Sequence, residues 1–532
     1  MLTPLLLIPF VGAALLLFSP AQTPPGRLRL GAILVLTLQL GWCLAVLARF
    51  DPTTTGMQLQ ESFSWVPEIG LDYRLGVDGL SLPLLLVNAA LTLVSVICTR
   101  DISQRPRIYF ALLLTISGAV NGAFLAGNLL LFFLFYELEL IPLWLLISIW
   151  GGAQRSYAAT KFLIFTAISG MLILGAFLGL ALFTGTVDFS LTPVLTERLA
   201  MGQQLLLLGA LLVGFGIKIP LVPFHSWLPD AHTQASTPVS VLLAGVLLKL
   251  GTYGLLRFCL GLFPEAWAVL APWLALWAAV SVLYGSLAAI AQTDMKRMVA
   301  YSSVGHMGYI LLAAAAATPV SLLGAEFQMV SHGLISALLF LLVGIVYRKT
   351  GTRNLDVLRG LLNPERGLPF TGCLMILGVM ASAGLPGMAG FISEFLVFRG
   401  SLDRFPVATL ACMVGSGLTA VYFLLLVNRA FFGRLAITRS LDPIQDARLD
   451  IQLAPVAPRE TLPATALALA VLGLGLLPIG LGRISESTTT AMAWAGGSVE
   501  SVERPQPAPQ AQPVANAISR AMNSGITMGG EG

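Results

Sequence analysis

Stretches of about 20 apolar residues recur along almost the whole chain, and each is long enough to cross a hydrocarbon core of roughly 30 Å. Only 11% of the 532 residues are charged, which excludes a soluble globular protein. The sequence therefore predicts an all-α polytopic membrane protein with about 14 transmembrane helices, formed as a single membrane domain by residues 1–485. The predicted spans lie near residues 2–19, 28–50, 78–99, 107–126, 128–150, 157–184, 203–222, 236–258, 267–291, 298–317, 320–347, 369–390, 391–433 and 461–484. Residues 391–433 are too many for one span, so we assign their start to a broken twelfth helix.

The distribution of basic residues predicts the orientation of the chain. The first stretch lacks the basic start of a signal peptide, so we expect it to be retained as a helix. The odd-numbered connections hold most of the Lys and Arg residues, whereas the 51–76 connection carries Asp51, Glu61, Glu68 and Asp72. The positive-inside rule then predicts, for an even number of helices, that both termini lie on the lumenal or periplasmic side.

The C-terminal tail, residues 486–532, is rich in Pro, Gln and Ala, and we expect it to be disordered or strapped onto a partner. The five cysteines lie far apart in apolar segments and form no CxxC pattern, so we interpret them as packing residues. No metal site, and no motif for a nucleotide, flavin, haem, iron–sulfur cluster or nucleic acid, is recognisable in the sequence.

Isolated charges lie inside otherwise apolar segments: Glu137, Lys218, Lys249 and Glu394. A charge at the centre of a bilayer costs from about 3 to more than 10 kcal/mol, and such residues usually mark an ion or proton path. These four residues therefore predict a protein that moves protons through a membrane.

Two apolar segments are interrupted by glycine and proline. One contains Pro220 and Pro223 soon after Lys218, and the other contains Pro386 upstream of Glu394. Paired interruptions in the seventh and twelfth spans indicate a transporter built from two inverted five-helix repeats, spans 4–8 and 9–13. The alternative is an ordinary proline kink in each span.

Glu137 and Glu139 are two residues apart, so on a helix they point roughly 200° from one another. Glu137 lies deeper in the apolar run, and we favour it as the functional carboxylate. We expect Glu139 to reach a neighbouring helix or subunit instead. The alternative for Glu137 is a buried carboxylate that only pins two helices through a salt bridge.

A buried lysine can gain or lose its proton when its surroundings change, whereas an arginine stays charged. Lys218 and Lys249 therefore suit a proton relay. The alternative for both is snorkelling to the interface, which Lys249, near the end of its span, allows more readily than Lys218. His306 and His332 lie in later spans and could connect the lysines to Glu394, with the hydrogen-bonded core histidine as the alternative. His225 and Asp230 are expected at the inner mouth of the path, or as part of a helix cap.

At this point the motifs resemble a known family. ELELIPLWLLISIWGG with SYAATKFLIFT, then KIPLVPFHSWLPDAHTQASTPVSVLLAGVLLKLGTYGLLR, QTDMKRMVAYSSVGHMGYI and GLPGMAGFISEF resemble the antiporter-like membrane subunits of respiratory complex I from about residue 70 to 435. Glu394 resembles the chain-4 type, because sister chains typically carry lysine there. The sequence around Glu137 and Lys161 resembles the cyanobacterial and chloroplast version of this subunit. We include Lys161 as an auxiliary residue of the proton path.

The resemblance implies a proton path through Glu137, Lys218, Lys249, His306, His332 and Glu394, in which the glutamate of the fifth helix pairs with Lys218. It implies a non-redox subunit of a proton-translocating NAD(P)H- or ferredoxin–plastoquinone oxidoreductase in a thylakoid or bacterial inner membrane. Plastoquinone and iron–sulfur clusters would lie in partner subunits of the membrane and peripheral arms, and this chain would contact lipids but bind no cofactor. The alternatives are a variant subunit of a CO2-uptake complex, an Mrp-like Na+/H+ antiporter, and a membrane spacer whose path has decayed.

Overall fold

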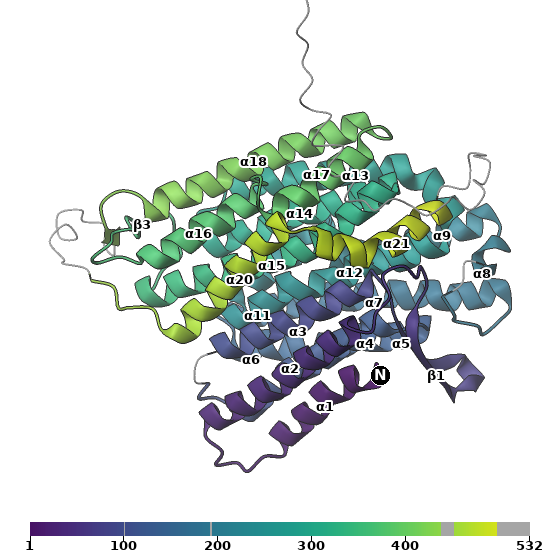
Figure 1. Cartoon of the computed structure of the whole chain (residues 1–532), viewed down its shortest axis with the longest axis horizontal. Helices are drawn as coiled ribbons and strands as arrows, with labels where there is room; N and C mark the ends of the chain where they lie inside the picture. The colour runs from purple at the N-terminus through teal and green to yellow at the C-terminus, as the bar shows by residue number, and fades with distance from the viewer. Residues whose placement is uncertain (100–101, 192–193, 438–451, 497–532) are drawn as a thin grey trace, which may run out of the picture.

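The computed structural model describes residues 1–99, 102–191, 194–437 and 452–496, and most of them form helices that run alongside one another (Figure 1). Twelve helices in this part of the chain are long and apolar enough to cross a membrane. Two shorter apolar helices, Thr3–Leu17 and Pro369–Ser382, accompany them. The predicted all-α polytopic fold is therefore confirmed, while the number of about 14 spans and the inverted repeats remain predictions.

The N-terminal half contains α1 (Thr3–Leu17), α2 (Pro25–Leu47), β1 (Gln58–Val66), η1 (Pro67–Ile69), β2 (Leu71–Val77), α3 (Ser81–Cys98), α4 (Pro106–Leu125), α5 (Leu129–Leu138), α6 (Leu140–Trp150), α7 (Arg155–Thr184), α8 (Val194–Glu197), α9 (Met201–Lys218), η2 (Phe224–Ser226), α10 (Trp227–Gln234), α11 (Thr237–Leu242), η3 (Leu243–Leu247), α12 (Leu248–Gly254) and η4 (Leu255–Leu260). The C-terminal half contains α13 (Pro264–Ile290), α14 (Met295–Ala316), α15 (Pro319–Thr350), β3 (Leu358–Arg359), α16 (Pro369–Ser382), α17 (Ala389–Ser401), α18 (Pro406–Phe431), β4 (Ala436–Ile437), α20 (Pro458–Leu476) and α21 (Ile479–Gly496).

The two predicted interruptions are present. α9 ends at Lys218, and the chain then turns through Pro220 and Pro223 before α10 begins. α16 ends at Ser382, and α17 begins only after Pro386. Proline ends a helix because it lacks the backbone N–H that the helix needs. The long stretch 391–433 divides into most of α17 and the whole of α18, so its start does belong to a broken helix.

The span from Thr237 to Leu260 is continuous but alternates between α-helical and π-helical turns. α11, η3, α12 and η4 follow one another from Thr237 to Leu260, and we call them together the 237–260 helix. η3 and η4 are π-helical turns on either side of α12, and such wide turns are frequent at functional sites. This helix is the most enclosed of the candidate spans, because its apolar window is wholly buried, whereas that of α2 is only 28% buried.

The 51–76 connection, expected as a loop, contains strand structure. β1 and β2 form an antiparallel hairpin, in which Phe63 lies opposite Tyr73. The hairpin and α8 lie at one end of the array, on the right in Figure 1, which we call the hairpin end. β3 and the Arg- and Lys-rich segment 348–368 lie at the other end, which we call the basic end.

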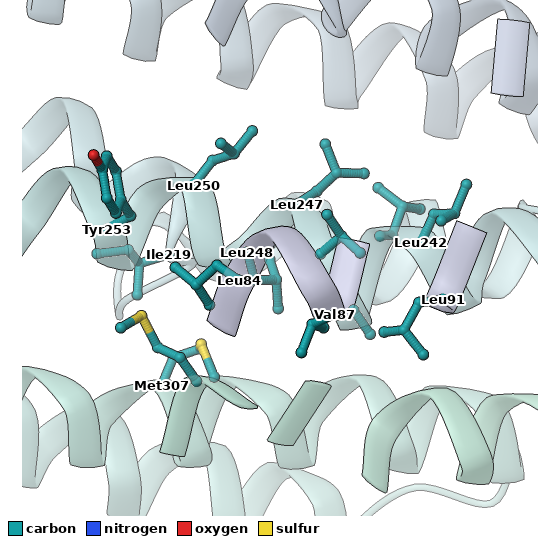
Figure 2. Packing of buried hydrophobic residues seen from close by; sticks show 14 of the residues in the cluster. Leu84, Val87, Leu91, Ile219, Leu242, Leu247, Leu248, Leu250, Tyr253 and Met307 are labelled. Carbon is teal, nitrogen blue, oxygen red and sulfur yellow. The ribbon is translucent and has the colours of Figure 1, made fainter. Parts of the chain in front are cut away.

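The middle of the array is formed by α14, α15 and the 237–260 helix. Side chains from α3, the α9 break, the 237–260 helix and α14 meet there, among them Leu84, Ile219, Leu248 and Met307 (Figure 2). α15 packs against α3, α14, α17, α20 and α21, and α20 and α21 cross over it in Figure 1.

The last described helix, α21, runs to Gly496, so residues 486–496 are helical rather than part of the predicted tail. The remainder of that tail, residues 497–532, lies outside the described residues.

Candidate functional site

The break after α9 positions Lys218. Because Pro220 and Pro223 cannot continue the helix, its final carbonyl groups need other donors. Trp227 supplies one, since its Nε1 donates to the Ile217 carbonyl at 2.8 Å. Lys218 is the last residue of α9 and is only 2% exposed, so the break places an ammonium group in the interior of the array.

Lys218 forms an ion pair with Glu139. The Lys218 and Glu139 side chains are 3% and 0% exposed, and Lys218 Nζ also lies 4.6 Å from the centre of the Tyr136 ring. The sequence analysis favoured Glu137 for the position opposite Lys218, and in the structure Glu139 occupies it. Glu139 lies at the junction between α5 and α6, where it is the only residue outside the two helices.

Glu137 points toward α7 instead. Its carboxylate lies so close to Gly170 that a Cβ at that glycine would collide with Glu137 Oε1. Glu137 is half-buried, and the charges of Lys218 and Glu139 both reach it. The two glutamates therefore face different helices, with Glu139 toward Lys218 and Glu137 toward α7.

Lys249 lies on α12, between the two π-helical turns. Its Nζ donates to the Ala244 carbonyl at 2.6 Å and lies 2.8 Å from His332 Nδ1 of α15. Lys249 is 1% exposed, so its side chain does not snorkel to an interface in this structure. Neither of these two partners, the Ala244 carbonyl and the His332 ring, carries a negative charge.

His332, His306 and Glu394 continue the series on α15, α14 and α17. The ring centres of His332 and His306 lie 5.4 Å apart, and His306 Nε2 lies 3.9 Å from Glu394 Oε1. Glu394 Oε2 accepts a hydrogen bond from Ser416 Oγ at 2.6 Å. A small cavity of about 10 Å³ is lined by these three residues together with Gln328, Ser382 and others, which is roughly the space one water needs.

The step from Lys218 to Lys249 has no direct hydrogen bond among the described residues. The two helices nevertheless approach closely at Gly251, because a Cβ there would lie 3.2 Å from Lys218 Cβ. Thus Glu139, Lys218, Lys249, His332, His306 and Glu394 form a buried series across the array, which we call the lateral axis.

The auxiliary residues lie apart from the lateral axis. Lys161 forms an ion pair with Asp230 at 2.7 Å, and Arg297 lies 3.5 Å from the other carboxylate oxygen. Asp230 lies in the first turn of α10, where its negative charge interacts favourably with the helix dipole. His225 packs edge-on against Tyr284, with ring centres 4.8 Å apart. No hydrogen bond among the described residues joins Lys161, Asp230 or His225 to the lateral axis.

The sequence analysis missed a second buried group of charges: Asp78, Arg257 and Glu326. Glu326 could have been found by the same signal that identified Glu394, because it is an isolated carboxylate in the apolar stretch 320–347. The part of the chain that the structure describes contains no cluster of three or more His, Cys, Asp or Glu side chains suited to a metal ion.

Comparison with known proteins adds to this geometry. The profile of the family described as NADH:quinone oxidoreductase/Mrp antiporter, TM matches residues 126–419, more than half of the chain. NAD(P)H-quinone oxidoreductase chain 4 1 of Synechococcus sp. (strain JA-2-3B'a(2-13)) is 41% identical over 517 residues, which cover 95% of each chain. NAD(P)H-quinone oxidoreductase chain 4 1 of Synechococcus elongatus is 42% identical over 450 residues, covering 84% of this chain and 82% of the relative.

Two solved structures share the fold. A chain of respiratory complex I from Thermus thermophilus with bound NADH has a TM-score of 0.82 at 28% identity, covering 94% of this chain and all of that one. A chain of the Mrp complex from Dietzia sp. DQ12-45-1b has a TM-score of 0.78 at 24% identity, covering 93% of this chain and 99% of that one. The curated relatives are subunits of a quinone oxidoreductase, and both structures are of multi-subunit complexes. The chain is therefore a multi-pass membrane subunit of an enzyme complex, and it belongs to the antiporter-like family shared by NADH:quinone oxidoreductases and Mrp complexes, among the NAD(P)H-quinone oxidoreductase chain 4 proteins.

Proposed function

We propose that this chain is the proton-translocating membrane-arm subunit of a photosynthetic NAD(P)H- or ferredoxin–plastoquinone oxidoreductase. The observation that carries the proposal is the lateral axis, a series of six buried titratable side chains from the α5–α6 junction to α17. Buried ionisable residues are costly in a membrane, and a series of them facing the interior of the array is typical of a proton relay. The chain 4 relatives from cyanobacteria support the assignment to this kind of complex.

In the proposed mechanism, the ion pair of Lys218 and Glu139 is the adjustable step. While the pair is closed, the carboxylate stabilises the proton on Lys218, and when Glu139 moves away Lys218 gives that proton up. The proton passes to Lys249, which is a neutral amine at this stage because its own proton has already moved on to His332, and Lys218 is left as a neutral amine. Lys249 then hands it to His332 across 2.8 Å, and it continues through His306 to the Glu394 carboxylate. Glu137 lies at the outer start of this series, beside α7.

Electron transfer in other subunits would drive this movement, so plastoquinone and iron–sulfur clusters are assigned to partner subunits, along with the site of the electron donor. We propose a thylakoid or bacterial inner membrane as the location, with both termini on the lumenal or periplasmic side. The acidic hairpin end and the basic end of the array support that orientation.

Substitution of Lys218 and Lys249 tests the mechanism. In vesicles that contain the assembled complex, Lys218→Ala and Lys249→Ala should each abolish most of the proton translocation driven by quinone reduction. Unchanged translocation in both variants would contradict the proposal and favour a spacer whose path has decayed.

Purification tests the kind of complex. We expect the chain to be isolated with quinone-reducing subunits. Isolation in an Mrp-like assembly without such subunits would instead support a Na+/H+ antiporter, whose fold the chain shares. The same experiment identifies a CO2-uptake variant from its accompanying subunits.

A further inference from the structure

Glu326 is a buried carboxylate that the lateral axis does not use. It lies on α15 with an exposed fraction of 0%, and neither of its carboxyl oxygens has a hydrogen-bond partner among the described residues. A buried polar group without a partner costs free energy, and an ionised one costs more. The presence of this carboxylate in the interior of the array therefore calls for a functional explanation.

The charged groups that face Glu326 already satisfy one another. Arg257 donates to Asp78 Oδ2 at 2.5 Å, and its Nε donates to the Tyr253 hydroxyl at 3.3 Å. The charges of Asp78 and Arg257 both reach Glu326. Because Asp78 and Arg257 neutralise each other, an ionised Glu326 would leave one net negative charge in the interior. The resting carboxyl group is therefore expected to hold its proton.

The other oxygen of Asp78 is also occupied. Asp78 Oδ1 accepts hydrogen bonds from the backbone N–H groups of Leu80 and Ser81, at the start of α3. This turn follows directly on β2, so the pair of Asp78 and Arg257 lies toward the hairpin end of the array. The Asp78 and Arg257 side chains are 3% and 13% exposed, so Arg257 is the more accessible member of the pair.

Glu326 is also connected to Lys249 by a series of contacts between α15 and the 237–260 helix. Lys249 meets His332 at 2.8 Å, and one turn further on Thr252 Oγ1 meets Met329 Sδ at 2.9 Å. The next turn places Glu326 near Tyr253 and Arg257. At 1.5 Å per residue, Glu326 lies about 9 Å along α15 from His332, in the direction of the hairpin end.

We propose that Glu326 is a proton-carrying residue that connects Lys249 to the hairpin end of the membrane, beside Asp78 and Arg257. This inference rests on the proposed function, since it gives the lateral axis an outlet within this chain. When Glu326 is ionised, it takes a proton from the Lys249 ammonium through water near the Thr252 hydroxyl. Lys249 becomes a neutral amine and Glu326 a neutral acid. Glu326 then releases the proton to water at the hairpin end and returns to the carboxylate.

The test uses the assembled complex in sealed vesicles, with proton translocation measured per quinone reduced. Glu326→Gln keeps the size of the side chain but cannot exchange a proton, and we expect it to lower translocation by at least about threefold. Glu326→Asp should restore at least half of the loss, since it restores a carboxyl group. Glu460→Gln is the control for the loss of a buried carboxylate away from this route, because Glu460 of α20 pairs with Arg348. In the complex that assembles with this variant, the number of protons translocated per quinone reduced should stay at the wild-type value.

A second readout separates a proton carrier from a structural acid. Redox-difference infrared spectra should contain a carboxylic-acid carbonyl band that shifts in D2O, and the band should be absent in Glu326→Gln. The inference is overturned if Glu326→Gln assembles and translocates protons like the wild type while Lys249→Ala does not. If Lys249→Ala and Lys218→Ala are also without effect, it is the proposed function that fails.

Discussion

Glu139 and Lys218 form an ion pair at the point where α9 breaks, and neither side chain is more than 3% exposed. The pair joins the α5–α6 junction to the end of α9, so any relative movement of these two elements changes the contact. In the low dielectric of the array, the two charges attract each other more strongly than on a protein surface, but both have lost their hydration. Removal of one partner would therefore leave an uncompensated buried charge.

The pair should therefore respond differently to single and double substitution. Lys218→Met or Glu139→Leu alone leaves a buried charge, which typically costs about 3–5 kcal/mol, and each should lower the amount of assembled complex. The double variant removes both charges and should assemble better than either single one, but it should not translocate protons. Native gel electrophoresis measures assembly, and a vesicle assay measures translocation. A double variant that assembles no better than the single ones would contradict the pairing.

The two neighbouring glutamates should differ in their effect on coupling. Glu139→Gln removes the charge that faces Lys218 and should lower quinone reduction coupled to translocation by about 100-fold, at the low end of the effect of a proton-transfer group. Glu137→Gln changes a half-buried carboxylate that faces α7, so its effect should be smaller. Initial rates per assembled complex decide the order. The reverse order would assign the adjustable step to Glu137.

The position of Glu137 can also be changed without substituting it. Gly170→Ala places a methyl group where Glu137 Oε1 lies, so the carboxylate must rotate away. Gly175→Ala on the same helix is the control, because no atom lies within 4 Å of a Cβ at that position. We expect both variants to assemble, with coupled activity lowered only in Gly170→Ala. Equal activity in the two variants would show that the orientation of Glu137 has no part in the relay.

Two glycines near Glu394 offer a similar comparison. Gly384 and Gly387 have φ values of +70° and +88°, so alanine strains the backbone at either position by about 1–2 kcal/mol. Only at Gly384 would the Cβ approach Glu394, lying 2.9 Å from its Oε2, while at Gly387 the nearest atom is a Leu476 methyl carbon at 3.8 Å. Thermal stability should fall similarly in Gly384→Ala and Gly387→Ala. Proton translocation should fall further in Gly384→Ala, and an equal loss in both would argue against a role for the Glu394 position.

Much of the fold could be predicted from the sequence because the bilayer imposes simple requirements. Apolar length marks the spans, and proline marks the breaks at Pro220 and Pro386, since both effects are local. The β1–β2 hairpin could not be predicted from the acidic residues of the 51–76 connection, because charge alone does not distinguish a strand from a loop. Residues 486–496 were assigned to the tail by composition, whereas α21 extends through them and packs on α15.

The site was harder to predict because the sequence shows which charged residues are buried but not which neighbouring helix each of them faces. A separation of two residues correctly implies that Glu137 and Glu139 face different ways, yet only the packing of α5, α6 and α9 determines which one meets Lys218. Glu326 has the same sequence signal as Glu394. Unlike Glu394, however, Glu326 has no glycine- and proline-rich interruption upstream in its span, so only one of the two signals that mark Glu394 is present.

The π-helical turns on either side of Lys249 give the two central lysines different means of support. The widened backbone at η3 offers the Ala244 carbonyl to the ammonium group of Lys249, so the helix itself takes the place of a counter-ion. Lys218 instead pairs with the carboxylate of Glu139, which belongs to the α5–α6 junction and would move with that element. The proton affinity of Lys218 would thus follow the position of Glu139, whereas the backbone support of Lys249 would stay in place each time a proton arrives and leaves.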